Sequence, residues 1–579
     1  MRKIIAFLLA AILLLTGVVS ALAEGISFTP GTYEGSARGM NGTLNVTVTV
    51  SENKIESIQV GDNGETVGYG DVAIDMIPQR IVDQQSLKVD TVAGATITSY
   101  AVMNAVESAL KQASSDLSAL KVAAPKAELV QGEDATVDVV IVGAGLAGIN
   151  AAYELKNNYP DVSYLILEQL DVITGSLPPS GGALLATNSY LHTEYDAVST
   201  IDDIIEELEK ATGHEINRSY AEKIYSNSEE LMDRLLDYGA EFPVHQLSSA
   251  ARNDKVTAFI AEDNGEGFAS FYYNLVKNHP INLRMHSKVT ELIVDEGTVV
   301  GVKVQDAEKE YSVHAKAVLL ATGGFGANKT LMEKYAPDFA PFFSRTSAGA
   351  DGSGFTLTEQ FNPEVIGTGV MGPNLAAALS LERFQYPFYV SKEGKRFANE
   401  KVNVDVLKAM REDGITPYVI VDGKYETPAS NWPWVESVQT HLDLGYAKKF
   451  DTLEELADAM GINKENLLAT VAEYNAAIDA GETLEFGLNP AQATKIDTPP
   501  YYVERLIGFY FGTIPSLKVD EEMHLLDGDG AIVPGLYCAG ELTEANLWDN
   551  NYPGAGVGIS YATYSGAYAI RTMMKDLNP

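Results

Sequence analysis

Alternating apolar and polar positions first appear at residues 43–50, TLNVTVTV, where a period of two predicts a strand with one buried face. A second strand pattern, KIESIQV, follows after a short turn. Residues 99–113 then place apolar side chains at the spacing of a helix. We therefore expect residues 28–113 to form a small α/β module.

The pattern changes further along the chain. Residues 114–136 are small, polar and weakly periodic, which is typical of a linker. After them, VDVVIV leads through glycines into an alanine-rich helix and then into a second apolar run, YLILE. This strand–turn–helix–strand order predicts a parallel sheet. The runs AVLLATGGFG (317–326) and GLYCAGE (535–541) predict two more buried strands.

A region of helical periodicity separates those last two strands. Residues 355–500 include TLEELADAMGINKENLLATVAEYNAAI, which is typical of consecutive helices in an inserted domain. The sheet-forming parts would then be residues 137–354 and 501–579. The predicted fold class is α/β, with several domains in a chain of 579 residues.

Composition excludes several classes of function. A formal net charge of −38 argues against a nucleic-acid partner, which would require a basic face. The single cysteine, Cys538, excludes intramolecular disulfides, thiolate-bound iron–sulfur clusters and C-x-x-C-H haem sites. Any redox chemistry would therefore use organic cofactors, and we expect no metal site.

The N-terminus has the pattern of an export signal. Arg2 and Lys3 precede a long apolar run that ends in Ala21-Leu22-Ala23. This predicts a signal peptide over residues 1–23. The apolar run is nearly long enough to span a bilayer, so an uncleaved membrane anchor is the alternative. In both cases we expect the protein outside the cytosol, at the cell surface or in the periplasm.

A dinucleotide-binding pattern lies at the first predicted parallel strand. Gly143, Gly145 and Gly148 form G-x-G-x-x-G between the strand and the helix, and Glu168 closes the second strand twenty residues later. The glycines would allow a tight turn, a close approach to a pyrophosphate and helix-on-strand packing. The helix N-terminus would face the phosphate, and Glu168 would accept hydrogen bonds from a ribose.

Several further motifs resemble those of the FAD-dependent fumarate reductase family, which includes urocanate and acrylate-type reductases and, more distantly, ketosteroid dehydrogenases. The motifs are VGAGLAGINAA, SGGALLA (180–186), ATGGFG, EGKRFANE (393–400) and GLYCAGE. The resemblance implies a Rossmann-like FAD-binding domain with an inserted capping domain. It also implies FAD contacts at Ser180, Gly181, Gly182, Gly323, Gly324 and Glu541.

The N-terminal module resembles the FMN-binding domain of flavinylated extracytosolic redox proteins. The resemblance rests on GTYEGSARGMNGTLNVTV, ETVGYGD (65–71) and DTVAGATITS. It implies FMN joined by a phosphoester bond to Thr96, with Asp90 in the motif read by an FMN transferase. Gly94 and Ala95 would give access to the hydroxyl. Ala93 replaces the usual Ser or Thr, Thr98 is a second candidate acceptor, and a helix cap is the alternative reading.

The chain departs from the fumarate reductase pattern at the substrate site. The motif GKRFxNExxxRD carries the family's proton-donating arginine, but here the stretch is GKRFANEKVNVD and the position is Val404. Both substrate-binding histidines are missing from Phe511–Ser516, and the substrate-binding arginine aligns with Tyr552. Arg383 matches an arginine of the family's proton-relay region. A pocket with so few cationic side chains is expected to bind a substrate other than a dicarboxylate, because each buried carboxylate needs a cationic partner.

The turn NNYPGAGVG resembles the Tyr-Pro-Gly-x-Gly of ketosteroid dehydrogenases. The resemblance implies that Tyr552 and the Gly556 N–H bind a substrate carbonyl; packing around FAD is the alternative. The proton donor remains unassigned among Lys401, Asp405 and Tyr510. Arg396 is expected to be a structural or flavin-side residue, and structural roles are expected for Cys538 and the WPW loop (432–434).

The sequence thus predicts an exported reductase of an activated C=C bond, an enone or enoate. Electrons would pass from FMN to FAD, and their source would be a membrane flavoprotein or a quinol. Two alternatives stay open: a ketosteroid-type dehydrogenase working in the oxidative direction, and an electron carrier with a decayed active site.

Overall fold

The computed structural model describes residues 26–124, 129–247, 256–377, 388–425, 442, 445–554 and 556–578. The predicted signal segment 1–23, Arg383 and the WPW loop lie outside the described residues. The chain divides into two compact units. Unit 1 comprises residues 1–327, 347–367 and 516–579, and unit 2 comprises residues 328–346 and 368–515.

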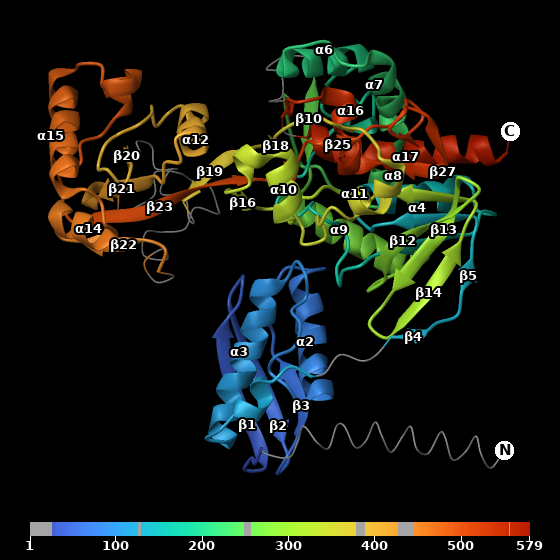
Figure 1. Ribbon diagram of the computed structural model, residues 1–579. Helices are drawn as coiled ribbons and strands as arrows, with labels where there is room; N and C mark the ends of the chain where they lie inside the picture. The colour runs from blue at the N-terminus through green and yellow to red at the C-terminus, as the bar shows by residue number, and fades with distance from the viewer. Residues whose placement is uncertain are drawn as a thin grey trace. The chain divides into compact units, whose positions relative to one another are not determined.

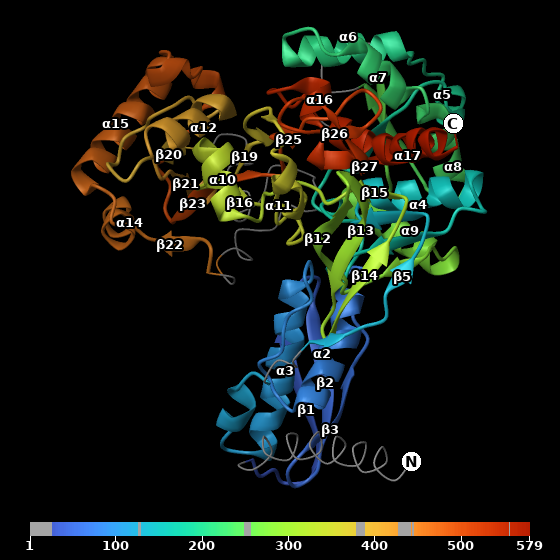
Figure 2. The same cartoon turned by 45° about the vertical axis from the view of Figure 1, so that its right-hand side comes forward.

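The N-terminal module is an antiparallel sheet with two helices on one face, and both Figure 1 and Figure 2 show the helices side by side. In strand order β1-β2-β3, the central strand has its even-numbered residues buried, as its alternation predicts. Helix α3 packs on β1 and β2, and α2 packs on β3. The elements are β1 (Gly31–Arg38), β2 (Thr43–Val50), β3 (Ile55–Val60), α2 (Gly70–Gln84) and α3 (Thr96–Ala113).

The second sheet of unit 1 is the predicted parallel sheet. Its order is β11-β7-β6-β15-β27-β26, and only β26 runs antiparallel to its neighbour. Strand β6 is buried at every position, as expected for a strand covered on both faces. The strands are β11 (Leu283–Arg284), β7 (Tyr164–Leu167), β6 (Val139–Val142), β15 (Ala317–Leu320), β27 (Ile532–Cys538) and β26 (His524–Leu526).

Two helices from opposite ends of the sequence pack together beside this sheet: α4 (Leu146–Asn158) and α17 (Val557–Leu577). Gly566 of α17 permits the close approach, because a Cβ there would lie 2.0 Å from the Ala147 carbonyl oxygen. The last segment of the chain therefore returns to the first βαβ unit, as a long dinucleotide would require.

An antiparallel ribbon forms a third layer of unit 1. Strands β12 (Lys288–Asp295), β13 (Thr298–Gln305) and β14 (Lys309–His314) pair in order. Two short strands from the predicted linker, β4 (Val130–Gln131) and β5 (Ala135–Thr136), add to β14 in parallel. Part of the segment 114–136 is thus tied to the antiparallel ribbon of unit 1.

The remaining elements of unit 1 surround these sheets. They are β8 (Ala183–Leu185), α5 (Tyr190–Glu194), α6 (Ile201–Thr212), α7 (Arg218–Tyr225), α8 (Ser228–Asp237), β9 (Val244–Leu247), β10 (Thr257–Ile260), α9 (Asn264–Asn278), α11 (Ser353–Thr358), β17 (Val365–Ile366), β25 (Ser516–Leu517) and α16 (Ala545–Trp548).

Unit 2 has its own sheet and two buried apolar clusters. The long strand β23 (Tyr501–Tyr510) pairs with most of the other strands, and α14 (Leu453–Met460) and α15 (Lys464–Ala480) form the predicted helix pair. The other elements are α10 (Lys329–Tyr335), β16 (Phe343–Ser344), β18 (Val370–Met371), β19 (Asn374–Ala377), β20 (Phe388–Val390), α12 (Asn403–Glu412), β21 (Tyr418–Asp422), β22 (Lys448–Phe450) and β24 (Gly512–Thr513).

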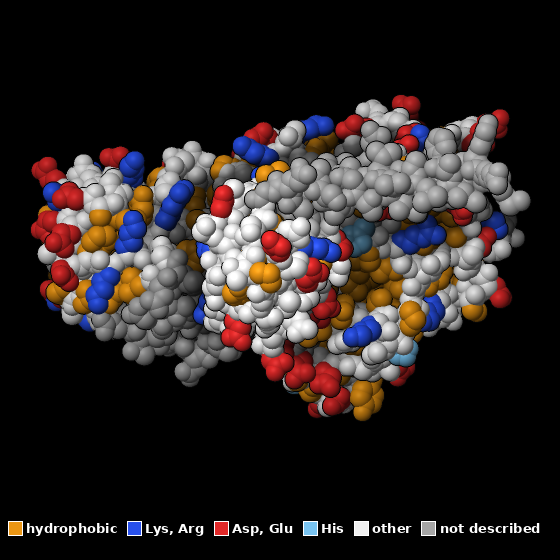
Figure 3. Space-filling view, turned by 90° about the horizontal axis from the view of Figure 1, so that it is seen from below, with side chains coloured by type: hydrophobic (Ala, Val, Ile, Leu, Met, Phe, Trp, Pro, Cys, Tyr) orange, Lys and Arg blue, Asp and Glu red, His pale blue; other side chains and the backbone are white. Residues whose placement is uncertain are grey.

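Two surveys of the described residues add to this picture. None of the helices described combines the length and apolarity that a membrane crossing needs. Acidic side chains are spread over the face seen in Figure 3, consistent with the net charge of −38.

Candidate active site

The turn between β6 and α4 is shaped by two glycines. Gly143 has φ +103°, and a Cβ there would lie 2.4 Å from the Ala321 carbonyl oxygen of the neighbouring strand end. A Cβ at Gly148 would lie 1.9 Å from the Gly143 carbonyl oxygen. Both positions therefore require glycine for contacts within the protein itself.

Gly145 differs from these two glycines because it faces open space. It is the N-cap of α4 with φ −73°, no side chain caps the helix, and nothing lies within 4 Å of a Cβ built there. The first N–H groups of α4 are thus open to a phosphate group. This arrangement fits the pyrophosphate of a dinucleotide.

Glu168 follows β7 and is almost fully buried. Its Oε2 accepts a hydrogen bond of 2.8 Å from the Ala144 N–H, and its Oε1 accepts one of 2.8 Å from the Leu170 N–H. Burial raises the pKa of this carboxyl. The carboxyl group therefore joins the dinucleotide turn to the loop 169–175, and its contact with a ribose stays a prediction.

The SGG segment forms a tight loop before β8. The Ser180 Oγ accepts a 3.2 Å hydrogen bond from the Gly182 N–H, and Gly182 has φ +63°. A Cβ at Gly182 would lie 2.3 Å from the Asn264 carbonyl carbon, whereas Gly181 is exposed with nothing near it. Gly181 is thus the open position of this loop.

The ATGG and AGE motifs lie beside each other because β15 and β27 are neighbours in the sheet. Gly323 has φ +71°, and a Cβ there would lie 3.9 Å from the Glu541 Oε2. The Gly324 carbonyl accepts a 3.2 Å hydrogen bond from the Gly352 N–H. These residues end the strands at the same edge of the sheet as the dinucleotide turn.

Tyr552 and Gly556 both lie at the start of α17. Gly556 is the N-cap with φ +90° and has no side chain that could cap the helix. The Gly558 N–H donates a 3.4 Å hydrogen bond to the Tyr552 hydroxyl, which places that hydroxyl at the helix N-terminus. Burial raises the pKa of Tyr552, so the hydroxyl keeps its proton at neutral pH.

Sequence reasoning missed two buried polar groups next to Tyr552. Among the described residues, the Glu544 Oε1 and the Trp548 indole N–H are buried without a hydrogen-bond partner. The Trp548 ring packs edge-on against Tyr552, with ring centroids 5.8 Å apart. Burial and the charge of Glu541 raise the pKa of Glu544 well above its usual range. No motif marks these residues in the sequence.

In the N-terminal module, Thr96 is the exposed first residue of α3. Ala95 is the N-cap, and no side chain caps the helix, so Thr96 is not the cap. Thr98, the second candidate acceptor, is buried, and its hydroxyl donates to a Glu65 carboxylate oxygen. Of the two hydroxyls, that of Thr96 is the one open to an incoming phosphate.

The proton-donor candidates of unit 2 differ in burial. Asp405 is exposed on α12, and Lys401, just before that helix, is also exposed, although partial desolvation lowers its pKa. Val404, at the position of the family's arginine, is exposed and carries no proton that it could donate. Tyr510 is buried at the end of β23.

Two of the residues for which structural roles are expected, Arg396 and Cys538, are buried. Arg396 is buried in an ion pair of 2.6 Å with Glu400, next to the rings of Tyr474 and Phe486. Cys538 is fully buried at the end of β27, and burial raises its pKa, which fits an unreactive thiol.

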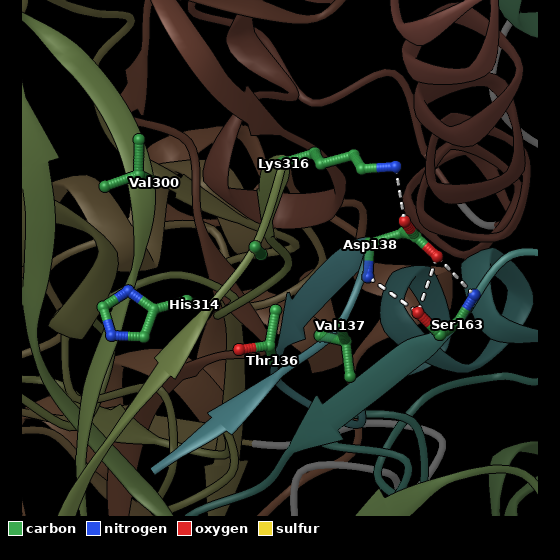
Figure 4. Close-up of a pocket in the computed structure, with 8 residues that line it drawn as sticks. Thr136, Val137, Asp138, Ser163, Val300, His314 and Lys316 are labelled. Atoms are coloured by element: carbon green, nitrogen blue, oxygen red, sulfur yellow. Dashed lines mark hydrogen bonds and ion pairs between the residues drawn. The ribbon is translucent and has the colours of Figure 1, made fainter.

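A pocket of about 370 Å³ lies at the opposite, amino-terminal ends of β6, β7 and β15. Figure 4 shows Lys316 and Ser163 turned toward Asp138. The Lys316 Nζ is 2.8 Å and the Ser163 Oγ 2.6 Å from the carboxylate, and these bonds lower the pKa of Asp138 to about 2. This pocket lacks the glycine turns and the tyrosine, so it is not the candidate active site.

Comparisons with known proteins agree with this geometry. The FAD binding domain model matches residues 138–559, and the FMN-binding domain model matches residues 39–111. The NADH:acrylate oxidoreductase of Vibrio harveyi is 29% identical over 93% of this chain, but the chain spans only 61% of that relative. The urocanate reductase of Eggerthella lenta is 28% identical over 90% of this chain and 88% of its own length.

Among solved structures, the open conformation of a flavocytochrome c3 fumarate reductase has the same fold. It superposes with a TM-score of 0.66 and 22% identity over 79% of this chain and 84% of its own. The expected fold class, an FAD-binding α/β domain preceded by an FMN-binding domain, is confirmed. The chain therefore belongs to the FAD-binding family of flavoproteins that includes fumarate and urocanate reductases, and it carries an FMN-binding domain ahead of its FAD-binding domain.

Proposed function

We propose that the protein is an exported reductase that adds two electrons and two protons across an activated C=C bond of an enone or enoate. The observation that carries this proposal is the Tyr552 hydroxyl at the N-terminus of α17, where it accepts a hydrogen bond from the Gly558 N–H, in a unit that also holds the glycine turns expected to bind FAD. The acrylate and urocanate substrates named for the relatives are conjugated enoates and support this substrate class.

The residues at this turn would bind the carbonyl of the substrate. Tyr552 stays protonated at neutral pH and can donate a hydrogen bond, and the Gly556 N–H is a second donor. Two donors aimed at a carbonyl oxygen stabilise the negative charge that develops there when a hydride adds to the conjugated carbon. FAD, held by the turns at Gly145, Gly181 and Gly323, would supply that hydride.

Fumarate is a poor candidate because a dicarboxylate needs several cations. The segment 511–516 consists of Phe, Gly, Thr, Ile, Pro and Ser, and both Thr513 and Ser516 are fully buried. Neutral hydroxyls do not replace histidine or arginine around a second carboxylate. A substrate with one carbonyl or one carboxylate fits this segment better.

We further propose that Thr96 carries FMN, attached by a transferase that reads Asp90 and the residues after it. The exposure of Thr96 and the uncapped start of α3 support this role, because both leave room for a phosphate on the hydroxyl. A covalent flavin suits a protein directed out of the cytosol by residues 1–23. Its electrons would come from a membrane flavoprotein or quinol.

The test is a substrate screen on protein exported by its own signal and matured with an FMN transferase. A reduced dye would be oxidised by acrylate-type, urocanate or aryl enoates and by enones, with fumarate weaker. Tyr552→Phe should lower kcat by about a hundredfold or more, as loss of one oxyanion donor does. Turnover of saturated ketosteroids with an oxidised dye would favour the dehydrogenase, and no turnover with any substrate would favour the electron carrier.

A further inference from the structure

Asp171 joins two parts of unit 1 through a buried carboxylate. Its Oδ1 lies 2.7 Å from the Arg80 Nη2 and 3.0 Å from the His286 Nδ1, and its Oδ2 accepts a 3.4 Å hydrogen bond from the Ala93 N–H. The Asp171 side chain is 9% exposed. Burial raises its pKa, but the His286 hydrogen bond and the charge of Arg80 outweigh burial, and the net pKa is below the ordinary value.

Arg80 connects this carboxylate to the segment that precedes Thr96. It lies on α2 of the FMN-binding domain, and its second terminal nitrogen, Nη1, donates a 2.7 Å hydrogen bond to the Asp90 carbonyl oxygen. One guanidinium thus holds the start of DTVAGAT and the loop 169–175 together. A planar group with several fixed donors can make both bonds at once, which the ammonium of lysine cannot reproduce.

A second set of contacts lies next to the first. The Tyr69 hydroxyl donates a 2.9 Å hydrogen bond to the Ile173 carbonyl and is also bonded to the Thr174 hydroxyl. A Cβ at Gly94 would lie 3.1 Å from the Val172 Cγ2. Nearby on α9, the Ser270 hydroxyl donates a 3.1 Å hydrogen bond to the Val67 carbonyl.

The other side of loop 169–175 contacts the dinucleotide turn. The Thr174 N–H donates a 2.8 Å hydrogen bond to the Ala144 carbonyl, and a Cβ at Gly175 would lie 3.5 Å from the Gly145 Cα. Thr174 is buried with φ +75°, a conformation that β-branched residues rarely adopt and that its surroundings must enforce. One loop therefore touches both the segment before Thr96 and the turn expected to bind FAD.

We propose that Asp171 is a positioning residue that docks the FMN-bearing segment 90–96 on loop 169–175 through Arg80, and so sets the rate of electron transfer from FMN to FAD. This inference rests on the proposed attachment of FMN to Thr96. Electron transfer between flavins slows steeply with separation, so a domain held only by its chain tether would deliver electrons less often than one held by a buried ion pair.

The test is a charge reversal in the full chain. Arg80→Asp and Asp171→Arg are made singly and together, with Lys303→Glu as the control, because Lys303 forms an exposed 2.8 Å ion pair with Glu291 on the ribbon. The first measurement is amide hydrogen exchange of residues 66–96 in flavin-free protein. Each single reversal should raise exchange in this segment, the double reversal should restore it in part, and the control should leave it unchanged.

The second measurement uses the flavin-loaded protein. After FMN is reduced, the rate of electron transfer to FAD should be at least about tenfold lower in each single reversal than in the parent. The rate in the double reversal should be closer to that of the parent. When a dye reduces FAD directly, the rate of substrate reduction should be the same in the variants as in the parent. FAD content, measured in each variant, controls for damage to the dinucleotide turn.

The outcomes separate this inference from the proposed function. Parent-like exchange in both single reversals would overturn the docking, and raised exchange with unchanged electron transfer would overturn its role in the reaction. If intact-mass analysis shows no FMN on Thr96, the proposed attachment and the electron-transfer role both fail, and the exchange measurement still decides the docking.

Discussion

Two glycine-containing turns in unit 1 lead into helices that no side chain caps, and they differ in what surrounds the glycines. Gly143, before α4, has φ +103°, and Gly94, before α3, has φ +90°. The atoms nearest to Gly143 are backbone atoms of the same sheet, whereas those nearest to Gly94 are the side chains of Val172 and Tyr69. The first turn, before α4, is thus enclosed by backbone of its own sheet region, whereas the second turn, before α3, is enclosed by Tyr69 of its own module and by Val172 of loop 169–175.

This difference changes the explanation of the small residues before Thr96. The sequence indicates that Gly94 gives access to the threonine hydroxyl. In the structure, Gly94 needs its positive φ and has Val172 against it, while the exposure of Thr96 comes from its place at the start of α3. Access and docking therefore depend on neighbouring but different residues.

The largest expected effect comes from removing the proposed acceptor in the second turn. Thr96→Ala should lose all covalently bound FMN, because the hydroxyl of Thr98, the other candidate acceptor, is buried. Flavin fluorescence should stay with the denatured parent chain and be absent from the variant, while FAD is released from both.

The matched control is Thr98→Ala. Thr98 is buried and its hydroxyl bonds to Glu65, so this variant should keep its FMN and lose about 1 kcal/mol of stability. Retention of FMN in Thr96→Ala with its loss in Thr98→Ala would assign the acceptor to Thr98 and remove the contrast between the two turns.

The first turn offers a contrast between two identical substitutions. Gly148→Ala places a methyl group 1.9 Å from the Gly143 carbonyl oxygen, and we expect a destabilisation of about 1–3 kcal/mol with weak FAD binding. Gly145→Ala meets nothing within 4 Å at φ −73°, so the flavin-free protein should be as stable as the parent or slightly more so. Its FAD affinity should nevertheless fall, because the methyl group occupies the approach of the pyrophosphate.

Thermal unfolding of the flavin-free variants and titration with FAD measure the two effects separately. Equal FAD affinity of Gly145→Ala and the parent would show that the pyrophosphate does not approach this glycine.

Gly94→Ala tests the second turn in the same way, with a smaller effect. The left-handed conformation costs about 1–2 kcal/mol for a residue with a Cβ, and the contact with Val172 adds to it. Val172→Ala should remove the contact with the added Cβ but not the cost of the backbone conformation. In a double-mutant cycle on the flavin-free chain, the double variant should therefore be more stable than the sum of the two single effects predicts, by about 0.5 kcal/mol or more. If the two changes in unfolding free energy were strictly additive, Val172 would not contact the residue at position 94 in solution.

The sequence predicts local features of this protein well and contacts between distant segments poorly. The alternation of 43–50 predicts β2 residue for residue, and the apolar run before Gly143 predicts β6, because these patterns record which faces are buried. Glu168 is recognisable as the acid after the second strand, but its bonds to Ala144 and Leu170 form only when the loop folds back. Arg80 and Asp171 are 91 positions apart in the sequence, and no local sequence pattern predicts their contact.

The proposed substrate site shows the same limit. Tyr552 and Gly556 stand out through a short motif, and the structure places the tyrosine hydroxyl at the start of α17. Glu544 and Trp548 carry no motif, because their role depends on burial without a partner rather than on spacing. Fold and cofactors were therefore predictable, but the buried acid beside the tyrosine was not.

The last expected effect depends on pH and is smallest near pH 5; it concerns the buried Glu544, near the start of α17. Burial raises the folded-state pKa of Glu544, so the folded protein holds a proton that the unfolded chain releases above its ordinary pKa of about 4.3. Glu544 therefore opposes folding more strongly as the pH rises, until the pH reaches its folded-state pKa. Glu544→Gln has nearly the same shape and no charge to lose.

The variant should match the parent near pH 4 and become progressively more stable than the parent between pH 5 and 8, by at most about 1.4 kcal/mol per pH unit. Unfolding midpoints of the flavin-free proteins at each pH measure the difference, and Glu291→Gln, an exposed carboxylate, should show no such trend. A difference that stays constant with pH would mean that Glu544 ionises normally in the folded protein. A neutral Glu544 beside Tyr552 would then be ruled out.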